Sequence, residues 1–292
     1  MQLLTDTQLV NNNWTDFIKD QLLFFIGSFF VLIAALISFF TYQSFKKFRF
    51  FFWAFVFTLA VFLYLKAKSY YAIGLYPIYF AFGAVYLEYL FKTGWKKYLK
   101  PAAIVIIIAL FIPLLMVAFP TMEPEETAQK SQRYKAFGLL RWEDGRDHEM
   151  PQDFADMLGW KELASKVDSV YSLLPDKSRT LVLCDNYGET GAINYYSKFK
   201  NINAVSMNAD YLHWFNLRKP ISDVILITDS YDDDTARTEE KPLFDTVLFT
   251  GKIENKYARE FGTRIYLLKH AKISVNERVQ QEIDENLEEW RH

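Results

Sequence analysis

A short run of lysines and tyrosines beside an apolar stretch holds the residues best suited to binding an anion. It reads Lys66-Ala-Lys68-Ser-Tyr70-Tyr71 and leads into an apolar segment that contains Pro77. Lysine carries a compact positive charge with three hydrogen-bond donors, and tyrosine is favoured at membrane–water interfaces. We predict that these two lysines and two tyrosines contact a lipid-linked phosphate. The alternative is that the lysines only anchor a helix at the interface.

A second polar run follows an apolar, strand-like segment. It begins at Asp185 and continues with Asn186, Tyr187, Gly188 and Glu189, where a strand would pass into a helix. Such a turn presents free backbone N–H groups at a helix N-terminus, where ligands commonly bind. The run lacks the glycine pattern and the Lys-Ser/Thr pair of phosphate-binding loops. We predict a ligand- or acceptor-facing loop, with a purely structural turn as the alternative.

A third run combines aromatic and polar residues, with Asn208, Tyr211 and Trp214 at regular three-residue spacing. Aromatic rings of this kind pack against sugar faces, and packing on a membrane-proximal surface is the alternative. His213 has no partner at metal-ligand spacing, so we expect no metal site there. Asp232–Asp234 lacks the later glycine and distal glutamate of a calcium loop and is most simply a solvated loop. We expect no cofactor and assign no catalytic residue.

Four uncharged apolar runs fill the first 122 residues and must position the lysine–tyrosine segment. They cover residues 21–45, 50–65, 69–87 and 101–122, which are 25, 16, 19 and 22 residues long. A helix needs about 20 apolar residues to cross the hydrocarbon layer. The 16-residue run is long enough if its flanking Arg49 and Lys66 extend to the headgroups. Because a soluble core helix would show a polar face, we predict four transmembrane helices.

The remaining residues alternate strand-like and helical patterns. Short runs rich in Val, Ile, Leu and Tyr predict five strands, at Thr180–Cys184, Ala204–Met207, Val224–Thr228, Thr246–Thr250 and Arg264–Lys269. Helices are predicted from Trp160 to Leu174, over Glu189–Phe199, and after a Ser274–Glu277 capping box. Most strands are continuously apolar, as in a parallel sheet covered on both faces. We therefore expect an α/β domain with a mainly parallel sheet.

The charge distribution predicts the orientation in a membrane. Basic residues gather in the loop after the first apolar run (Lys46, Lys47, Arg49) and the loop after the third (Lys92, Lys96, Lys97, Lys100). By the positive-inside rule, both loops face the cytoplasm. The predicted domains are an extracytoplasmic segment 1–20, a four-helix region 21–119 and an extracytoplasmic α/β domain 120–292. Lys66 and Lys68 then lie at the outer face of the cell inner (cytoplasmic) membrane.

Two further observations exclude classes of partner and chemistry. Residues 1–119 hold ten Lys/Arg and four Asp/Glu, so the remainder holds 23 and 31, a balance of -8. An acidic domain is repelled by phosphates, which argues against a nucleic-acid partner. The one cysteine, Cys184, lies in an apolar run, where an inert buried thiol is expected.

At these motifs the chain resembles bacterial protein-mannosyltransferase-like enzymes, within the glycosyltransferase family 39 type that includes lipid A aminoarabinose transferases. The resemblance extends from about Leu22 to about Lys269. It is carried by the following segments: Lys66 to Pro77 with Gly83-Ala84 and Glu88, Pro151–Asp156, Gly159-Trp160, Asn186–Ala192, and Asn208 to Trp214. It implies an integral-membrane, inverting transferase that takes a sugar from a polyprenyl-phosphate donor at the outer membrane face, in protein glycosylation or other cell-envelope synthesis. In that family the lysine–tyrosine segment faces the donor phosphate.

The resemblance also predicts what the chain lacks. The family's catalytic acid is usually an Asp/Glu pair in the first extracytoplasmic loop, whereas the N-terminal segment here offers Asp6 and Asp16 without such a pair. The chain resembles the C-terminal half of such an enzyme, so we expect it to be inactive alone and to need a separate N-terminal catalytic half. Its expected partners are membrane lipid and a polyprenyl-phosphate-linked sugar. The alternative is a non-catalytic, membrane-anchored module that binds a glycan or another protein.

Overall fold

The computed structural model describes residues 14–291 of the 292-residue chain. The chain divides into two compact units, residues 1–148 and residues 149–292. The first unit is helical, and the second is an α/β unit. Asp6 and the rest of residues 1–13, which belong to the predicted N-terminal segment, lie outside the described residues.

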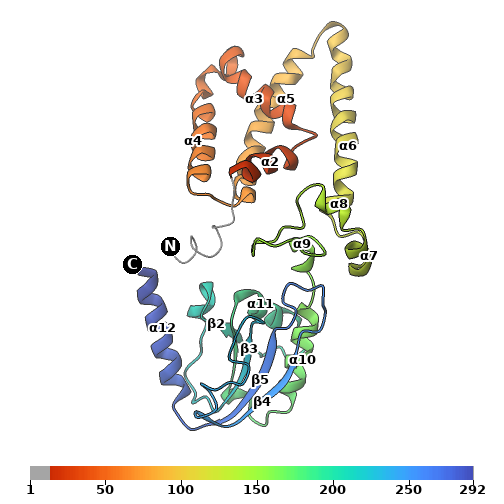
Figure 1. The fold of residues 1–292 in the computed structure, drawn as a ribbon. Helices are drawn as coiled ribbons and strands as arrows, with labels where there is room; N and C mark the ends of the chain where they lie inside the picture. The colour runs from red at the N-terminus through yellow and green to blue at the C-terminus, as the bar shows by residue number, and fades with distance from the viewer. Residues whose placement is uncertain (1–13, 292) are drawn as a thin grey trace. The chain divides into compact units, whose positions relative to one another are not determined.

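The helical unit consists of α-helices joined by short 3₁₀ turns (Figure 1). In chain order these are α2 (Trp14–Phe24), α3 (Phe29–Thr41), η1 (Gln43–Phe48), α4 (Phe50–Tyr64), η2 (Ser69–Leu75), α5 (Tyr76–Leu90), η3 (Gly94–Tyr98), α6 (Leu99–Ala118), α7 (Pro124–Gln129) and α8 (Gln132–Lys135).

Four membrane-spanning helices were predicted, and the helical unit bears this out only in part. Two helical stretches, Ser69–Leu90 and Gly94–Leu115, are long and apolar enough to cross a membrane. Helices α2 and α3 add a third span if they are counted together, but they are bent by 98°. Helix α4 has 15 residues, a length of about 22 Å, which is shorter than the hydrocarbon layer. The helices therefore indicate a membrane-associated chain with two or three candidate spans.

The two departures from the prediction have local causes. The first apolar run breaks at Gly27-Ser28, where Gly27 approaches the backbone of α6 so closely that a Cβ would lie 3.1 Å from the Ile107 carbonyl oxygen. Glycine–serine pairs are common sites of sharp helix bends. Helix α4 ends because Lys66 adopts a left-handed conformation (φ 50°) and the Ala67 N–H donates to the Phe62 carbonyl oxygen at 2.9 Å. This is the hydrogen-bond pattern of a Schellman C-cap.

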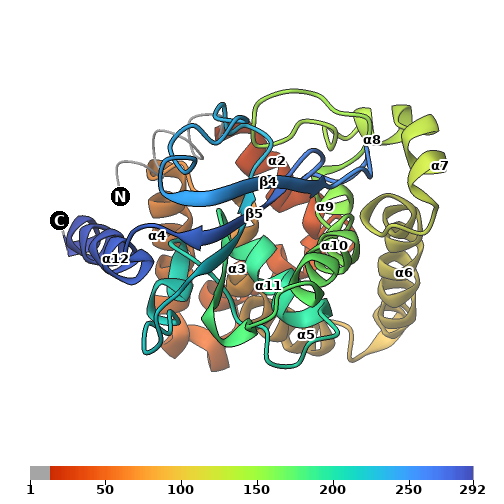
Figure 2. The ribbon, with the colours of Figure 1, turned by 90° about the horizontal axis from the view of Figure 1, so that it is seen from below.

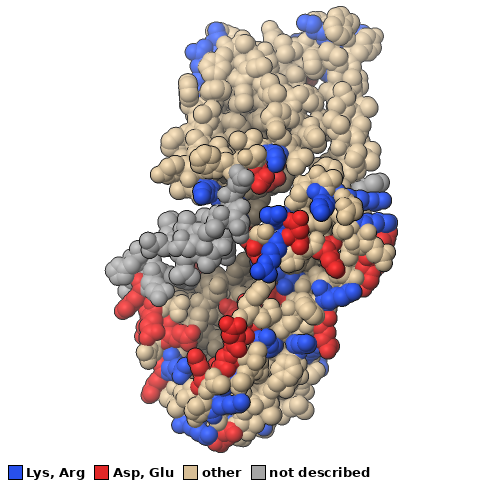
Figure 3. Space-filling model, viewed as in Figure 1, with Lys and Arg blue, Asp and Glu red and all other residues tan. Residues whose placement is uncertain are grey.

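The two basic loops lie at the same end of the helical unit. They form η1 and η3, which join α3 to α4 and α5 to α6 (Figure 1). Figure 3 shows basic side chains at that end and, on the face drawn, a broad uncharged band over the helices. The η2 turn that follows Lys68 lies at the opposite end (Figure 1). The basic residues that predict the orientation therefore lie together at one end of this unit.

The α/β unit contains all five predicted strands. Its elements are α9 (Gln152–Ala155), α10 (Trp160–Ser172), η4 (Lys177–Arg179), β1 (Thr180–Cys184), α11 (Tyr187–Tyr196), β2 (Ala204–Ser206), η5 (Ala209–His213), β3 (Asp223–Thr228), β4 (Phe244–Lys252), β5 (Arg264–Ala271) and α12 (Val275–Arg291). The strands form one sheet in the order β2-β1-β3-β5-β4. The prediction of an α/β unit is confirmed.

The prediction of a mainly parallel sheet is wrong, because the sheet is mixed. Strands β2, β1 and β3 pair in parallel, whereas β5 is antiparallel to both β3 and β4. A parallel crossover generally needs a dozen or more residues and a helix, and the segment 253–263 between β4 and β5 is short and without a helix. Helices cover both faces, with α10 and α11 on one side and α12 on the other (Figures 1 and 2). Continuous apolar strands therefore reflect burial on both faces and do not indicate strand direction.

Candidate functional site

The lysine–tyrosine segment is positioned by two neighbouring structures of the helical unit. Lys66 is the left-handed residue that ends α4, and Lys68 precedes the η2 turn in an extended conformation. The side chains of Tyr70 and Tyr71 are exposed, and their rings meet edge to face with centroids 4.9 Å apart. The four residues predicted to contact phosphate therefore differ in exposure, because Lys68 is half-buried whereas the side chains of Lys66, Tyr70 and Tyr71 are exposed.

Lys68 forms an ion pair with Glu143, a residue that the sequence reasoning missed. Its side chain is 13% exposed and that of Glu143 is 33% exposed. Burial by itself lowers the pKa of Lys68, but the hydrogen bond and the negative charge of Glu143 outweigh it, so the pKa is raised. Lys68 is therefore a charged ammonium group held by a carboxylate.

A hydrogen-bond network connects α2 to the η2 turn after Lys68. The Ser69 hydroxyl donates to Asp20 Oδ2 at 2.7 Å, and the Gln21 amide donates to the Ser69 carbonyl oxygen at 2.9 Å. The Tyr76 hydroxyl in turn donates to Gln21 Oε1 at 2.9 Å. Asp20 and Gln21 were not predicted as site residues, although two polar residues at the edge of an apolar run are a signal for such a role. They hold the lysine-bearing turn against α2.

In the α/β unit, the structure brings the second and third polar runs to one edge of the sheet. Asp185 follows β1 directly, Asn208 follows β2, and Asp229 follows β3. These three strands are parallel neighbours, so their carboxyl ends share an edge. The chain passes from β1 to β2 on one side and later to β3 on the other, which makes this edge a topological switch point. Ligands of open α/β sheets bind at such edges.

The predicted ligand loop forms the N-terminus of α11, which begins two residues before the predicted Glu189. Asn186 and Glu189 make a capping box, in which the Glu189 N–H donates to Asn186 Oδ1 at 3.0 Å and the Asn186 N–H reaches Glu189 Oε2 at 3.4 Å. Gly188 allows Trp160 to pack close by, since a Cβ there would lie 3.2 Å from the ring. Tyr187 is exposed. The turn therefore has the structural role that is the alternative to ligand binding, because it caps α11. The capping box does not use every polar atom of the turn.

Glu189 is the least ordinary residue of this edge. It is 0% exposed, and its Oε1 atom has no hydrogen-bond partner. Burial, followed by the charges of Glu260 and Asp185, raises its pKa to about 8. Burial also raises the pKa values of Asp185 and Glu260. Glu189 is thus a neutral carboxylic acid near pH 7, able to donate as well as accept a hydrogen bond.

The third run lies beside this edge as an aromatic surface. Tyr211 packs over α11, with its hydroxyl 3.4 Å from the position that a Cβ on Gly191 would occupy. The ring centroids of Trp214 and Tyr211 lie 4.8 Å apart, and Trp214 is 55% exposed. Asn208 is exposed. An exposed aromatic surface next to the buried carboxyl group of Glu189 has the composition of a polyol-binding site, and packing on a membrane surface is its alternative.

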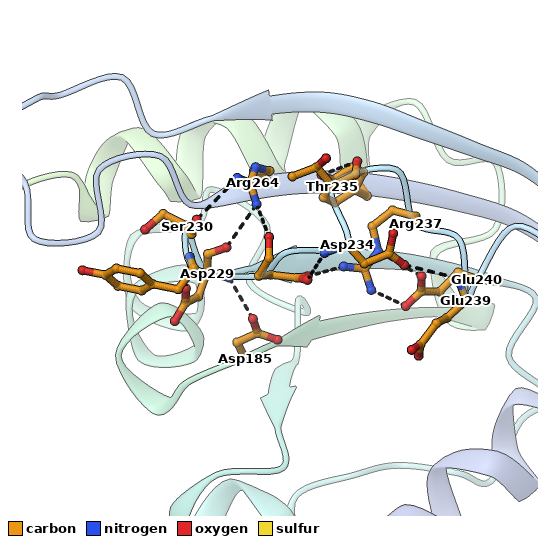
Figure 4. Close-up of polar contacts among 12 residues, drawn as sticks. Asp185, Asp229, Ser230, Asp234, Thr235, Arg237, Glu239, Glu240 and Arg264 are labelled. Atoms are coloured by element: carbon orange, nitrogen blue, oxygen red, sulfur yellow. Dashed lines mark hydrogen bonds and ion pairs between the residues drawn. The ribbon is translucent and has the colours of Figure 1, made fainter. Parts of the chain in front are cut away.

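The loop after β3 is held by arginine contacts and is only partly a solvated loop (Figure 4). The Asp229 N–H donates to Asp185 Oδ2 at 2.8 Å, which ties β3 to β1. Arg264 donates to the Asp232 carbonyl oxygen at 3.0 Å. Arg237 is buried and pairs with Asp232 and Glu240. Among residues 14–291, no group of three His, Cys, Asp or Glu side chains is arranged to hold a metal ion.

Comparison of the chain with protein-family models, with curated proteins and with solved structures found no match in any of the three.

Proposed function

We propose that this chain contributes the donor-phosphate contacts and an extracytoplasmic domain to a membrane glycosyltransferase that uses a polyprenyl-phosphate sugar. The proposal is supported by the motif resemblance from Lys66 to Pro77 and by the position of Lys68 beside the candidate span Ser69–Leu90. The catalytic carboxylates are not assigned to this chain.

The observation that carries the proposal is the environment of Lys68. Its ammonium group has three donors, and Glu143 is its hydrogen-bond partner. It is largely buried at the end of an apolar helical stretch, where screening by water is weak and an anion is attracted strongly. A phosphate at the membrane surface has the acceptor oxygens and the negative charge to bind this ammonium group.

The arrangement within the helical unit supports the orientation that we propose. Glu143 comes after α6 and contacts Lys68, which comes before α5, so both lie at the end opposite the basic η1 and η3 loops. The positive-inside rule places the η1 and η3 loops in the cytoplasm and Lys68 outside.

Reporter fusions test this orientation. A fusion at Glu123 should be active only with a reporter that works outside the cytoplasmic membrane, and a fusion at Lys96 only with one that works inside. The same compartment for both positions, or the reverse pattern, would remove the donor-side argument.

The phosphate contact is tested by replacing Lys66 and Lys68 together with Gln, which keeps hydrogen-bond donors on a side chain one atom shorter and removes the charge. Binding of a polyprenyl phosphate to the purified chain should weaken by about tenfold or more, since a charge-assisted hydrogen bond contributes about 1.5–3 kcal/mol. The matched control replaces Lys96 and Lys97 with Gln at the other end of the unit. Equal binding by the parent and both double variants would leave the lysines as interfacial anchors.

A second candidate function is a membrane-anchored module that binds a glycan or a protein. The carboxyl edge of the α/β unit favours it, because a neutral Glu189 and an exposed aromatic surface are present there without any need for phosphate. Soluble-oligosaccharide binding that persists in the Lys66/Lys68 double variant, together with absent polyprenyl-phosphate binding by the parent, would favour the module over the transferase.

A further inference from the structure

Glu143 is presented to Lys68 by a small, self-contained hairpin. Arg141 and Asp147 pair across it as an antiparallel bridge, and their side chains form an ion pair at 2.7 Å. The Trp142 N–H donates to the Arg146 carbonyl oxygen at 2.9 Å, and the turn closes at Gly145 with a φ of 75°. Glu143 stands in this turn, 75 residues from Lys68 in the chain.

The hairpin is held together by groups other than the Glu143 carboxylate. The rings of Trp142 and His148 stack with centroids 3.7 Å apart, and His148 Nε2 lies 2.8 Å from Asp144 Oδ2. The His148 N–H donates to the Leu140 carbonyl oxygen at 2.9 Å. These contacts do not include the ion pair of Glu143 with Lys68, so loss of that ion pair leaves them in place.

A carboxylate and a phosphate bind an ammonium group in the same way, because both provide negative charge and acceptor lone pairs. Both cannot take the same donor of Lys68. A phosphate that approaches Lys68 from the membrane surface also meets the like charge of Glu143, which disfavours its binding further.

We propose that Glu143 is a resident counter-ion that competes with the lipid phosphate for Lys68 and so sets how strongly, and with which anions, this site is occupied. This inference rests on the proposed phosphate contact. The sugar-linked donor is a phosphodiester with one negative charge, whereas polyprenyl phosphate, which remains after sugar transfer, is a monoester with about -1.5 to -2 charges near neutral pH. The monoester therefore displaces the carboxylate better than the diester does. Glu143 is thus a specificity-determining residue for the headgroup.

Binding of undecaprenyl phosphate to the full chain, purified in detergent, tests the competition. Glu143→Gln keeps the shape of the side chain and removes its charge, so binding should tighten by about fivefold, as expected for loss of one competing, partly buried ion pair. The matched control is Glu88→Gln, which removes a carboxylate that pairs with Lys100 at 3.2 Å in the same unit. It changes the net charge equally and should leave binding at the parent value. Undecaprenol, which lacks the phosphate, should bind all variants equally.

A double-mutant cycle with Lys68→Gln separates competition from a structural effect. Once Lys68 is gone, Glu143→Gln should bring much less gain, because the carboxylate no longer competes for an ammonium donor. Equal or weaker binding by Glu143→Gln than by the parent would overturn the inference, as would an equal gain from Glu88→Gln. If Lys68→Gln weakens binding and Glu143→Gln changes nothing, the proposed phosphate contact stands and only the counter-ion role falls. If Lys68→Gln has no effect, both fall.

Discussion

The Glu189→Gln variant is expected to keep its α/β unit folded to higher pH than the parent chain. Glu189 is fully buried with an unpartnered Oε1, and its pKa is raised from 4.5 to about 8 by burial and by the charges of Glu260 and Asp185. Between these two pH values the folded unit holds a proton that the unfolded chain releases. The free energy of unfolding therefore falls as the pH rises, by up to about 1.4 kcal/mol per pH unit from this residue.

The direction of the pKa shift defines the pH range over which the stability of the α/β unit changes. Below about pH 4.5 the carboxyl group is protonated in both states and contributes its full stability. This contribution is lost progressively as the pH rises towards 8, and above 8 the loss is complete. Gln has the shape of the neutral acid and does not titrate, so the variant should resemble the parent near pH 5 and exceed it by several kcal/mol at pH 8 to 9. Asp185 and Glu260 also have raised pKa values and remain in the variant. The free energy of unfolding of the variant therefore still falls with rising pH, but less steeply than that of the parent.

Labelling of Cys184 measures this stability within the α/β unit alone. It is the chain's one cysteine, lies in β1 and is buried, so a thiol reagent reacts with it when the unit opens. Rates are referred to the chemically unfolded chain at each pH, because thiol reactivity itself depends on pH. Glu288→Gln, at an exposed position of α12, is the control. A Glu189→Gln variant with the same pH dependence as the parent would show that Glu189 is ionised in the folded unit.

The Gly83→Ala variant is expected to disrupt the contact between α3 and α5. A Cβ on Gly83 would lie 2.0 Å from the Val31 carbonyl oxygen and 2.9 Å from its carbonyl carbon. These are backbone atoms, so no side-chain rotation relieves the clash and the two helices must separate. Glycine at a helix crossing allows such close approach in membrane proteins. Overpacking typically costs about 1–3 kcal/mol, and a backbone clash this short falls at or above the upper end.

Thermal unfolding of the detergent-purified chain, followed by the fraction that remains monodisperse, measures the effect. Gly74→Ala is the matched control, because a Cβ on Gly74 meets nothing within 4 Å. It should unfold with the parent, whereas Gly83→Ala should lose its folded fraction at clearly lower temperature. Similar curves for both variants would contradict the close packing of α3 on α5. Tyr76 and Tyr79 are buried in the same helix, so a shift of α5 should also weaken the phosphate binding that we propose at Lys68.

Sequence patterns predicted the elements of the α/β unit well because burial and local backbone preference act over neighbouring residues. Strand β1 occupies the predicted Thr180–Cys184, and α10 runs from Trp160 to Ser172, just before Pro175. At the start of α12, the Glu277 N–H donates to Ser274 Oγ at 3.3 Å, which is one of the two bonds of the predicted capping box. Apolar length likewise predicted membrane association, whereas the number of spans depended on the Gly27 bend and the Lys66 cap.

The sequence by itself thus determined where strands and helices form, that apolar helices precede an acidic α/β unit, and that basic residues mark two loops. Only the tertiary structure decided which polar groups meet. The ion pair of Lys68 with Glu143, the bond of Asp229 to Asp185 and the packing of Tyr211 over Gly191 join residues far apart in the chain. Periodicity reports whether a residue is buried and on which face, because that depends on its own element. Charge pairing and the raised pKa of Glu189 depend on groups that belong to other elements, and no local sequence pattern shows which of these groups will lie nearby.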